Sequence, residues 1–130
     1  MKIRTGFVSN SSSSCFILDY SNPEVKKLFK GRASDNSWDA DKGRCTCFLK
    51  GKEVVDYVNR YVPRDDATGD WILKWARKLG EDNIVFVRES DEAMGGSIFG
   101  GEEGQYSEDP KIKEQYKKFH ELVLAETEYH

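Results

Sequence analysis

Two kinds of apolar pattern alternate along the chain: short uninterrupted runs, and stretches in which apolar residues recur every three or four positions. The runs Cys15–Leu18 and Ile84–Val87 are typical of strands buried on both faces, and the second favours a central place in a sheet. Cys45–Leu49 is short, aromatic and β-branched, which predicts a further strand. Residues 2–8 alternate in part and predict a strand that is able to form a hairpin with 15–18 across the serine-rich turn 9–14.

Four stretches carry their apolar residues at helical spacing, and each has a residue that starts or stops a helix. Asn and Asp cap helix N-termini, Pro suits the first helical position, and Gly or Pro ends a helix. The predicted helices run from Pro23 (capped by Asn22) to Gly31, from Lys52 to Val62 (stopped by Pro63), from Asp70 to Leu79 (stopped by Gly80) and from Pro110 (capped by Asp109) to Val123.

The predicted element order is β-β-α-β-α-α-β-α, with residues 32–43 as a loop. A mixed order that opens with a hairpin favours an α+β fold, in which helices pack on a small mixed, mainly antiparallel sheet. A chain of 130 residues has room for one such core, so we expect a single domain over 1–130. The acidic, Gly-rich segment at 90–108 is long enough for a functional or mobile loop.

Composition excludes several classes of protein. With 38% hydrophobic residues, three Trp, six Tyr and seven Phe, the chain can build a small core. A net charge of −3 argues against a generally cationic nucleic-acid binder, so we expect no direct nucleic-acid partner. No apolar run approaches the ~20 residues of a membrane span, so we expect no membrane partner. Three cysteines are too few and odd in number for a disulfide scaffold, which favours a reducing cytosol.

The charge is distributed unevenly. Residues 1–64 contain 12 Lys/Arg and seven Asp/Glu, whereas residues 65–130 contain eight Lys/Arg and 16 Asp/Glu. Such an acidic excess either stays solvated as a loop or meets a cationic partner. The acids that follow one another without an intervening Lys or Arg are Glu89, Asp91, Glu92, Glu102, Glu103, Glu108 and Asp109.

The first 16 residues contain Lys2, Arg4 and the run Gly6-Phe7-Val8-Ser9-Asn10-Ser11-Ser12-Ser13-Ser14-Cys15-Phe16. This opening resembles the N-terminal signature K-x-R-x-G-F-V-S-N-S-S-S-S-S-F of uncharacterised proteins from tailed bacteriophages and prophage regions. Cys15 stands where the signature has a fifth serine. The resemblance implies a phage origin and assigns no catalytic residue.

The serine-rich turn also has a physical interpretation of its own. Successive backbone N–H groups in a turn can form an anion-binding nest, and hydroxyl groups add further donors. A structural hairpin turn is the competing interpretation, because the sequence lacks a phosphate-loop motif. The residues of the anion-binding alternative are Lys2, Arg4, Ser11, Ser12, Ser13 and Arg44.

The pair Cys45 and Cys47 raises the question of a metal site, with Cys15, His120 and His130 as further candidate ligands. Zinc sites use paired ligands separated by two to four residues, and here a single residue separates the pair. Free cysteines also pack as small apolar residues. We therefore expect no metal and no cofactor, and we expect His120 to be a structural residue of the last helix.

These observations favour a phage-encoded, non-enzymatic accessory protein of the host cytoplasm. We expect it to bind and modulate a host protein that has a basic surface, as inhibitors of host defence or agents of host takeover do. One alternative is a protein that sequesters a small anionic or nucleotide ligand, and another is a virion-associated structural protein. The residues expected to bind the host partner are Glu89, Asp91, Glu92, Phe99, Glu102 and Glu103.

Overall fold

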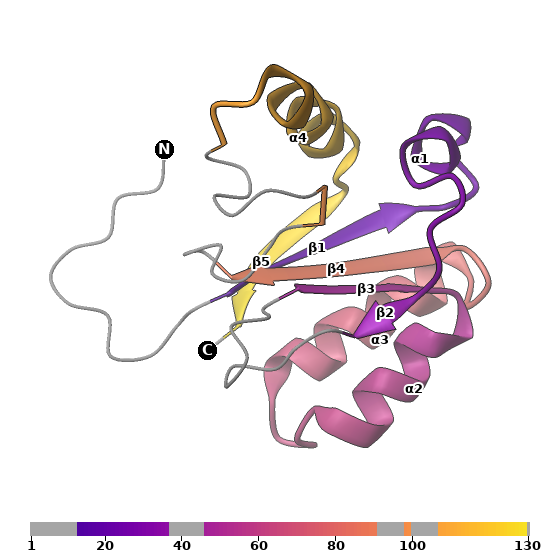
Figure 1. Ribbon diagram of the computed structural model, residues 1–130. Helices are drawn as coiled ribbons and strands as arrows, with labels where there is room; N and C mark the ends of the chain where they lie inside the picture. The colour runs from indigo at the N-terminus through magenta and orange to yellow at the C-terminus, as the bar shows by residue number, and fades with distance from the viewer. Residues whose placement is uncertain (1–12, 37–45, 91–97, 100–106, 130) are drawn as a thin grey trace, which may run out of the picture.

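A computed structural model describes residues 13–36, 46–90, 98–99 and 107–129, and its strands form one five-stranded sheet (Figure 1). The strand order is β2-β3-β4-β1-β5, and the four pairings among these residues are antiparallel. The predicted α+β fold is thereby confirmed. The elements are β1 (Ser13–Asp19), α1 (Pro23–Leu28), β2 (Asp35–Asn36), β3 (Thr46–Lys50), α2 (Lys52–Tyr61), α3 (Ala67–Leu79), β4 (Ile84–Ser90), α4 (Pro110–Leu122) and β5 (Ala125–Tyr129).

Helices cover both faces of the sheet. Figure 1 shows α1 and α4 on one side of the strands and α2 and α3 on the other. Because both faces are covered, successive side chains of the inner strands must all be apolar. This explains why β1 and β4 contain uninterrupted apolar runs, and it confirms the central place predicted for Ile84–Val87, since β4 lies between β3 and β1.

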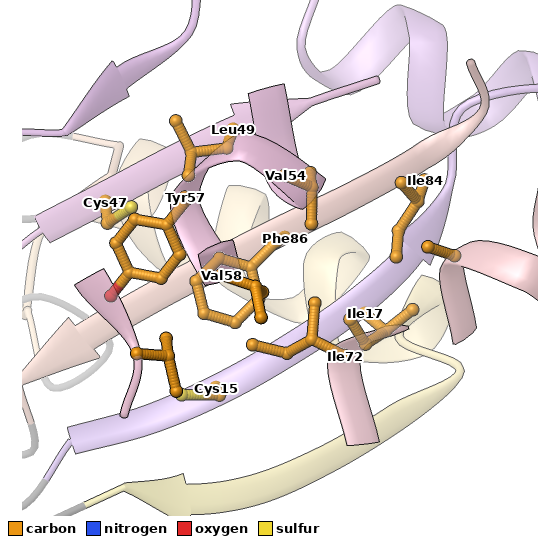
Figure 2. Packing of buried hydrophobic residues seen from close by; sticks show 12 residues of the cluster. Cys15, Ile17, Cys47, Leu49, Val54, Tyr57, Val58, Ile72, Ile84 and Phe86 are labelled. Carbon is orange, nitrogen blue, oxygen red and sulfur yellow. The ribbon is translucent and has the colours of Figure 1, made fainter. Parts of the chain in front are cut away.

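The alternation of side chains along each strand divides the core into two clusters. Cys15 and Ile17 of β1 face α2 and α3, whereas Phe16 and Leu18 face α1 and α4. Figure 2 shows the first cluster, in which strand side chains and helix side chains point toward one another. Its buried members are Cys15, Ile17, Cys47, Leu49, Val54, Tyr57, Val58, Val62, Ile72, Ala76, Ile84 and Phe86. Those of the second are Phe16, Leu18, Val25, Phe29, Phe48, Val85, Val87, Ile98, Tyr116 and Phe119.

The capping residues predicted from the sequence act as expected at two helices, and a cap that was not predicted sets the start of a third. The side chains of Asn22 and Asp109 accept hydrogen bonds from backbone N–H groups two residues later. The Asp66 side chain accepts a hydrogen bond of 2.8 Å from the backbone N–H of Thr68, so α3 begins at Ala67 rather than at Asp70. A side-chain cap satisfies a backbone donor that the helix itself leaves unpaired.

Three further differences from the predicted elements concern residues with little apolar character. Ser13 and Ser14 belong to β1 instead of the serine-rich turn, and residues 35–36 form a two-residue strand within the predicted loop. The strand β5 was not expected, because its sequence Ala-Glu-Thr-Glu-Tyr is polar. Among the described strands it pairs with β1 at the edge of the sheet, and an edge strand needs less apolar side chain than a central one. The strand predicted at 2–8, and hence the hairpin, lies outside the described residues.

Within the described ranges, none of the helices has the length and apolar character needed to cross a bilayer.

Phe86 provides a test of the cluster in Figure 2, because its ring is buried and packs against the ring of Tyr57 at 5.5 Å between centroids. Phe86→Ala should lower the free energy of unfolding by about 3–5 kcal/mol through lost burial and a residual cavity. Leu124→Ala is the control, because Leu124 is 49% exposed and should cost about 1 kcal/mol or less. Urea denaturation followed by circular dichroism measures both, and equal losses would contradict this packing.

Candidate functional site

A buried carboxylate stands near the end of the central strand. Glu89 continues the alternation of Val85 and Val87 on β4, so its side chain faces the α1/α4 layer, and only 5% of it is exposed. Its Oε2 atom accepts a hydrogen bond of 2.7 Å from the Tyr116 hydroxyl of α4. The same oxygen accepts one of 3.2 Å from the backbone N–H of Ile98. A buried charge needs such donors to offset the water it has lost.

Arg32 holds the other side of the same peptide segment. The residue lies just after α1, and its Nη1 donates a hydrogen bond to the carbonyl oxygen of Ile98. Its guanidinium also lies over the Phe48 ring, 5.9 Å from the ring centroid. The N–H of Ile98 therefore donates to the Glu89 carboxylate, and the carbonyl of Ile98 accepts from the Arg32 guanidinium. We call these three residues, Glu89, Ile98 and Arg32, the clasp.

The clasp places Phe99 in an aromatic cluster between α1 and α4. The Phe99 ring is stacked on the ring of Phe29, the residue that follows α1, with 5.8 Å between centroids and 19° between planes. It meets the rings of Tyr116 and Phe119 edge-on, at 4.9 and 5.8 Å. Edge-on and offset ring pairs of this kind add to the stabilisation that burial provides. Ile98 and Phe99 are thereby fixed against the end of α1 and against α4.

A cavity of about 320 Å³ opens beside the clasp. Four of its lining residues are apolar, and the others are two cations and an amide. Burial lowers the pKa of Arg32 from its ordinary value, and the nearby Asp35 acts in the opposite direction. Phe29 and Ile98 are almost fully buried, so Leu28 and Phe99 form the accessible apolar wall. An apolar wall beside cations suits a small anion that also has an apolar part. The lining residues are Leu28, Phe29, Lys30, Arg32, Ile98, Phe99 and Gln115.

The opposite face of the sheet carries a second group of polar and sulfur-containing side chains, Cys15, Arg88 and Cys47. Cys15 and Cys47 both lie directly opposite Arg88 in the strand register, so β4 separates the two thiols (Figure 2). Strands two positions apart are about 10 Å apart, which is too far for a disulfide. Burial raises the pKa of Cys47 to about 12, so its thiol is protonated at neutral pH. Arg88 donates a hydrogen bond of 3.1 Å to the Tyr57 hydroxyl.

The candidate zinc ligands that the structure describes, Cys15, Cys47 and His120, do not come together. Cys15 and Cys47 belong to the cluster under α2 and α3, whereas His120 lies on α4 across the sheet, beside the Phe16 ring. In the described part of the chain no three His, Cys, Asp or Glu side chains are grouped closely enough to bind a metal ion. Cys45 and His130 lie outside the described residues.

The structure locates some of the residues expected to bind a partner and corrects one of them. Glu89 is buried in the clasp, so its carboxylate is not part of an exposed acidic surface. Phe99 is half-buried among aromatic rings, and Ser13 is the first residue of β1. The remaining candidates lie outside the described residues: Asp91, Glu92, Glu102 and Glu103 of the acidic set, and Lys2, Arg4, Ser11, Ser12 and Arg44 of the anion-binding set.

Sequence reasoning missed the contributions of Arg32 and Tyr116. One signal was present for Glu89, since the every-second-residue pattern of Val85 and Val87 continues onto it and predicts the buried face. No comparable signal marks Arg32, because its partner Ile98 is far away in the sequence.

Comparisons of the chain with protein-family models, with curated proteins and with solved structures find no match.

The clasp yields a stability prediction. Glu89→Ala should leave the Tyr116 hydroxyl and the Ile98 N–H without their buried acceptor, at a cost of about 1–3 kcal/mol for each donor. Glu89→Gln should recover part of that loss, because one amide oxygen can replace the single Oε2 atom that accepts both bonds. Urea denaturation gives the unfolding free energies. Equal losses in the Ala and Gln variants would contradict the proposed role of this oxygen, and Tyr116→Phe tests one donor separately.

His120 yields a pH prediction. Burial lowers the pKa of His120, although Glu126 on β5 opposes the shift. The unfolded chain therefore binds this proton more readily than the folded chain, and the contribution to stability is full above the unfolded pKa of about 6.5. It is lost as the pH falls from there through the lower pKa of the folded state. Thermal unfolding between about pH 7.5 and 5 should show a shallower decline for His120→Gln than for the parent chain, and identical slopes would contradict the shift.

Proposed function

We propose that the chain is a phage-encoded accessory protein that acts in the host cytoplasm by binding a host protein. The phage origin is the implication of the N-terminal signature over residues 1–16. The proposal of binding rests on one observation above all, the succession of seven acids from Glu89 to Asp109 without a Lys or Arg among them. An acidic segment of this kind is complementary to a basic groove, and charge complementarity speeds and orients association.

The clasp makes this proposal more specific. Asp91 and Glu92 follow β4 in the sequence, and Glu102 and Glu103 follow Phe99 by three and four residues. Between these two acidic pairs lies Ile98, which Glu89 and Arg32 hold against the α1/α4 layer. We therefore propose that the partner-binding acids are Asp91, Glu92, Glu102 and Glu103, with Glu89 as the residue that anchors their segment.

A non-enzymatic role is part of the proposal. The chemical character of the buried side chains supports it: the Cys47 thiol, with its pKa raised to about 12, is a poor nucleophile. The carboxylate of Glu89 accepts hydrogen bonds from Tyr116 and Ile98 and lies inside the second core cluster. Both groups contribute to packing.

A second candidate function is the sequestration of a small anionic ligand. The observation that favours it is the cavity beside Arg32 and Lys30, which combines cations with an apolar wall. This candidate differs from the first in its partner, a small molecule instead of a host protein. The virion-associated alternative remains a hypothesis from the sequence.

The test of the host-protein proposal is affinity purification of the tagged chain from infected host cells. A variant with Lys in place of Asp91, Glu92, Glu102 and Glu103 should lose a specific host protein that the parent chain retains, because the change reverses the local charge. Mass spectrometry identifies and quantifies the captured proteins.

A matched variant controls for the change in total charge. It carries Lys in place of four exposed acids on the α2/α3 side of the molecule, namely Asp56, Asp65, Glu81 and Asp82. This control should retain the host protein. Loss of capture in both variants, or in neither, would contradict the assignment, and copurification of the chain with virus particles would favour the virion alternative.

A further inference from the structure

We infer that the cavity between the end of α1, Ile98–Phe99 and α4 binds a small aromatic anion, meaning a flat ring joined to a phosphate or a carboxylate. The inference rests on the second candidate function and gives that function a site and a ligand class. A volume of about 320 Å³ lies at the lower end of the range usual for small-molecule sites, about 300–1,000 Å³. Helices α1 and α4, which border the cavity, lie on the same side of the sheet (Figure 1).

Arg32 is the group that would recognise the anion. Its guanidinium has five N–H donors, of which one bonds the Ile98 carbonyl. In the described part of the chain Arg32 makes no ion pair, so no carboxylate of those residues holds its remaining donors. The contact with the Phe48 ring at 5.9 Å and the bond to Ile98 hold the planar group in place. A guanidinium fixed in this way matches the two oxygens of a phosphate or carboxylate.

The charges around the cavity favour an anion. Burial costs the Arg32 cation part of its hydration, and a bound anion would offset that cost. Lys30 lies on the rim as a second, exposed cation. Among the carboxylates of the described residues, Asp35 acts on Arg32 electrostatically, and Arg32, Lys30 and Asp35 together carry one net positive charge at neutral pH.

The apolar wall favours a ring as the rest of the ligand. The half-buried side chains of Phe99 and Leu28 form the accessible part of this wall, and the buried Phe29 ring supports Phe99 from behind, with 19° between the two ring planes. Aromatic side chains of this kind stack on flat rings such as nucleobases. Gln115 of α4 adds an amide that can donate to or accept from a polar atom of such a ring.

Isothermal titration of the full chain provides the test. The probes are adenosine monophosphate and indole-3-carboxylate, with inorganic phosphate and adenosine as probes of each half of the ligand. At least one ring-bearing anion should bind at least about tenfold more tightly than either half, because the wall and the guanidinium act on different parts of it. Binding of adenosine monophosphate alone would identify the anion as a phosphate, and binding of the indole acid alone as a carboxylate.

Two variants and a control assign binding to this cavity. Arg32→Gln should weaken binding by at least about tenfold, since it removes a charge-assisted bidentate contact. Arg32 also holds Ile98, so Lys30→Gln provides a second variant at an exposed position that leaves the clasp intact. It should weaken binding by about threefold, as loss of one exposed cation does. Lys27→Gln removes the same charge from α1 outside the cavity lining and should bind like the parent chain.

The outcomes separate the site from the function. If a ring-bearing anion binds the parent chain, and Lys30→Gln and Arg32→Gln bind it equally well, the cavity is not the site, although ligand sequestration stands. If none of the probes binds the parent chain at millimolar concentration, both the site and the second candidate function are wrong. If phosphate alone binds as tightly as the ring-bearing probes, the aromatic part of the inference is overturned.

Discussion

The hydrogen bonds to the buried carboxylate of Glu89 join the central strand to the helical layer that covers it. A carboxylate removed from water is costly unless donors surround it, and here the donors come from α4 and from the backbone of Ile98. The Tyr116 donor is 27 residues from Glu89 in the sequence and the Ile98 donor is nine, so both bonds form only when strand, helix and the Ile98 segment have assembled. Arg32, Phe99 and the cavity beside them take their positions from this arrangement.

The sheet imposes a second constraint, since antiparallel sheets commonly leave one face to solvent and this one is covered on both. Polar residues on the inner strands are then confined to the strand ends. Arg88 and Glu89 stand together near the end of β4 and point to opposite faces, where a tyrosine hydroxyl meets each of them. The same end of the sheet thus carries the Glu89 carboxylate on one face and the Arg88 guanidinium on the other.

The parts of the fold that depend on local sequence were predictable. The apolar run Ile84–Val87 indicated a central strand, and Asn22 and Asp109 marked the starts of two helices, because a cap acts on backbone groups two residues away. The start of α3 was placed too late, although Asp66 has the same capping chemistry.

The parts that depend on distant contacts were not predictable from pattern alone. The polar strand β5 is stabilised by its register with β1, which its own sequence does not reveal. The candidate site follows the same division. The sequence marks Phe99 as a candidate for partner binding, but it does not reveal the contacts of this ring with Phe29 and Tyr116, which come from elsewhere in the chain. An acid count likewise could not separate the buried Glu89 from the other acids of its segment.

The pairing of β1 with β5 has a consequence for how the molecule acquires its structure. Ile17 lies opposite Ala125, so two neighbouring strands are separated by more than 100 residues of chain. Contacts of such long sequence separation close late and slow folding. During synthesis β1 emerges before β4 and β5 and waits for both, with its apolar run and two hydrogen-bonding edges uncovered. An unpaired apolar strand is prone to join other chains, so β1 is exposed to aggregation during this interval.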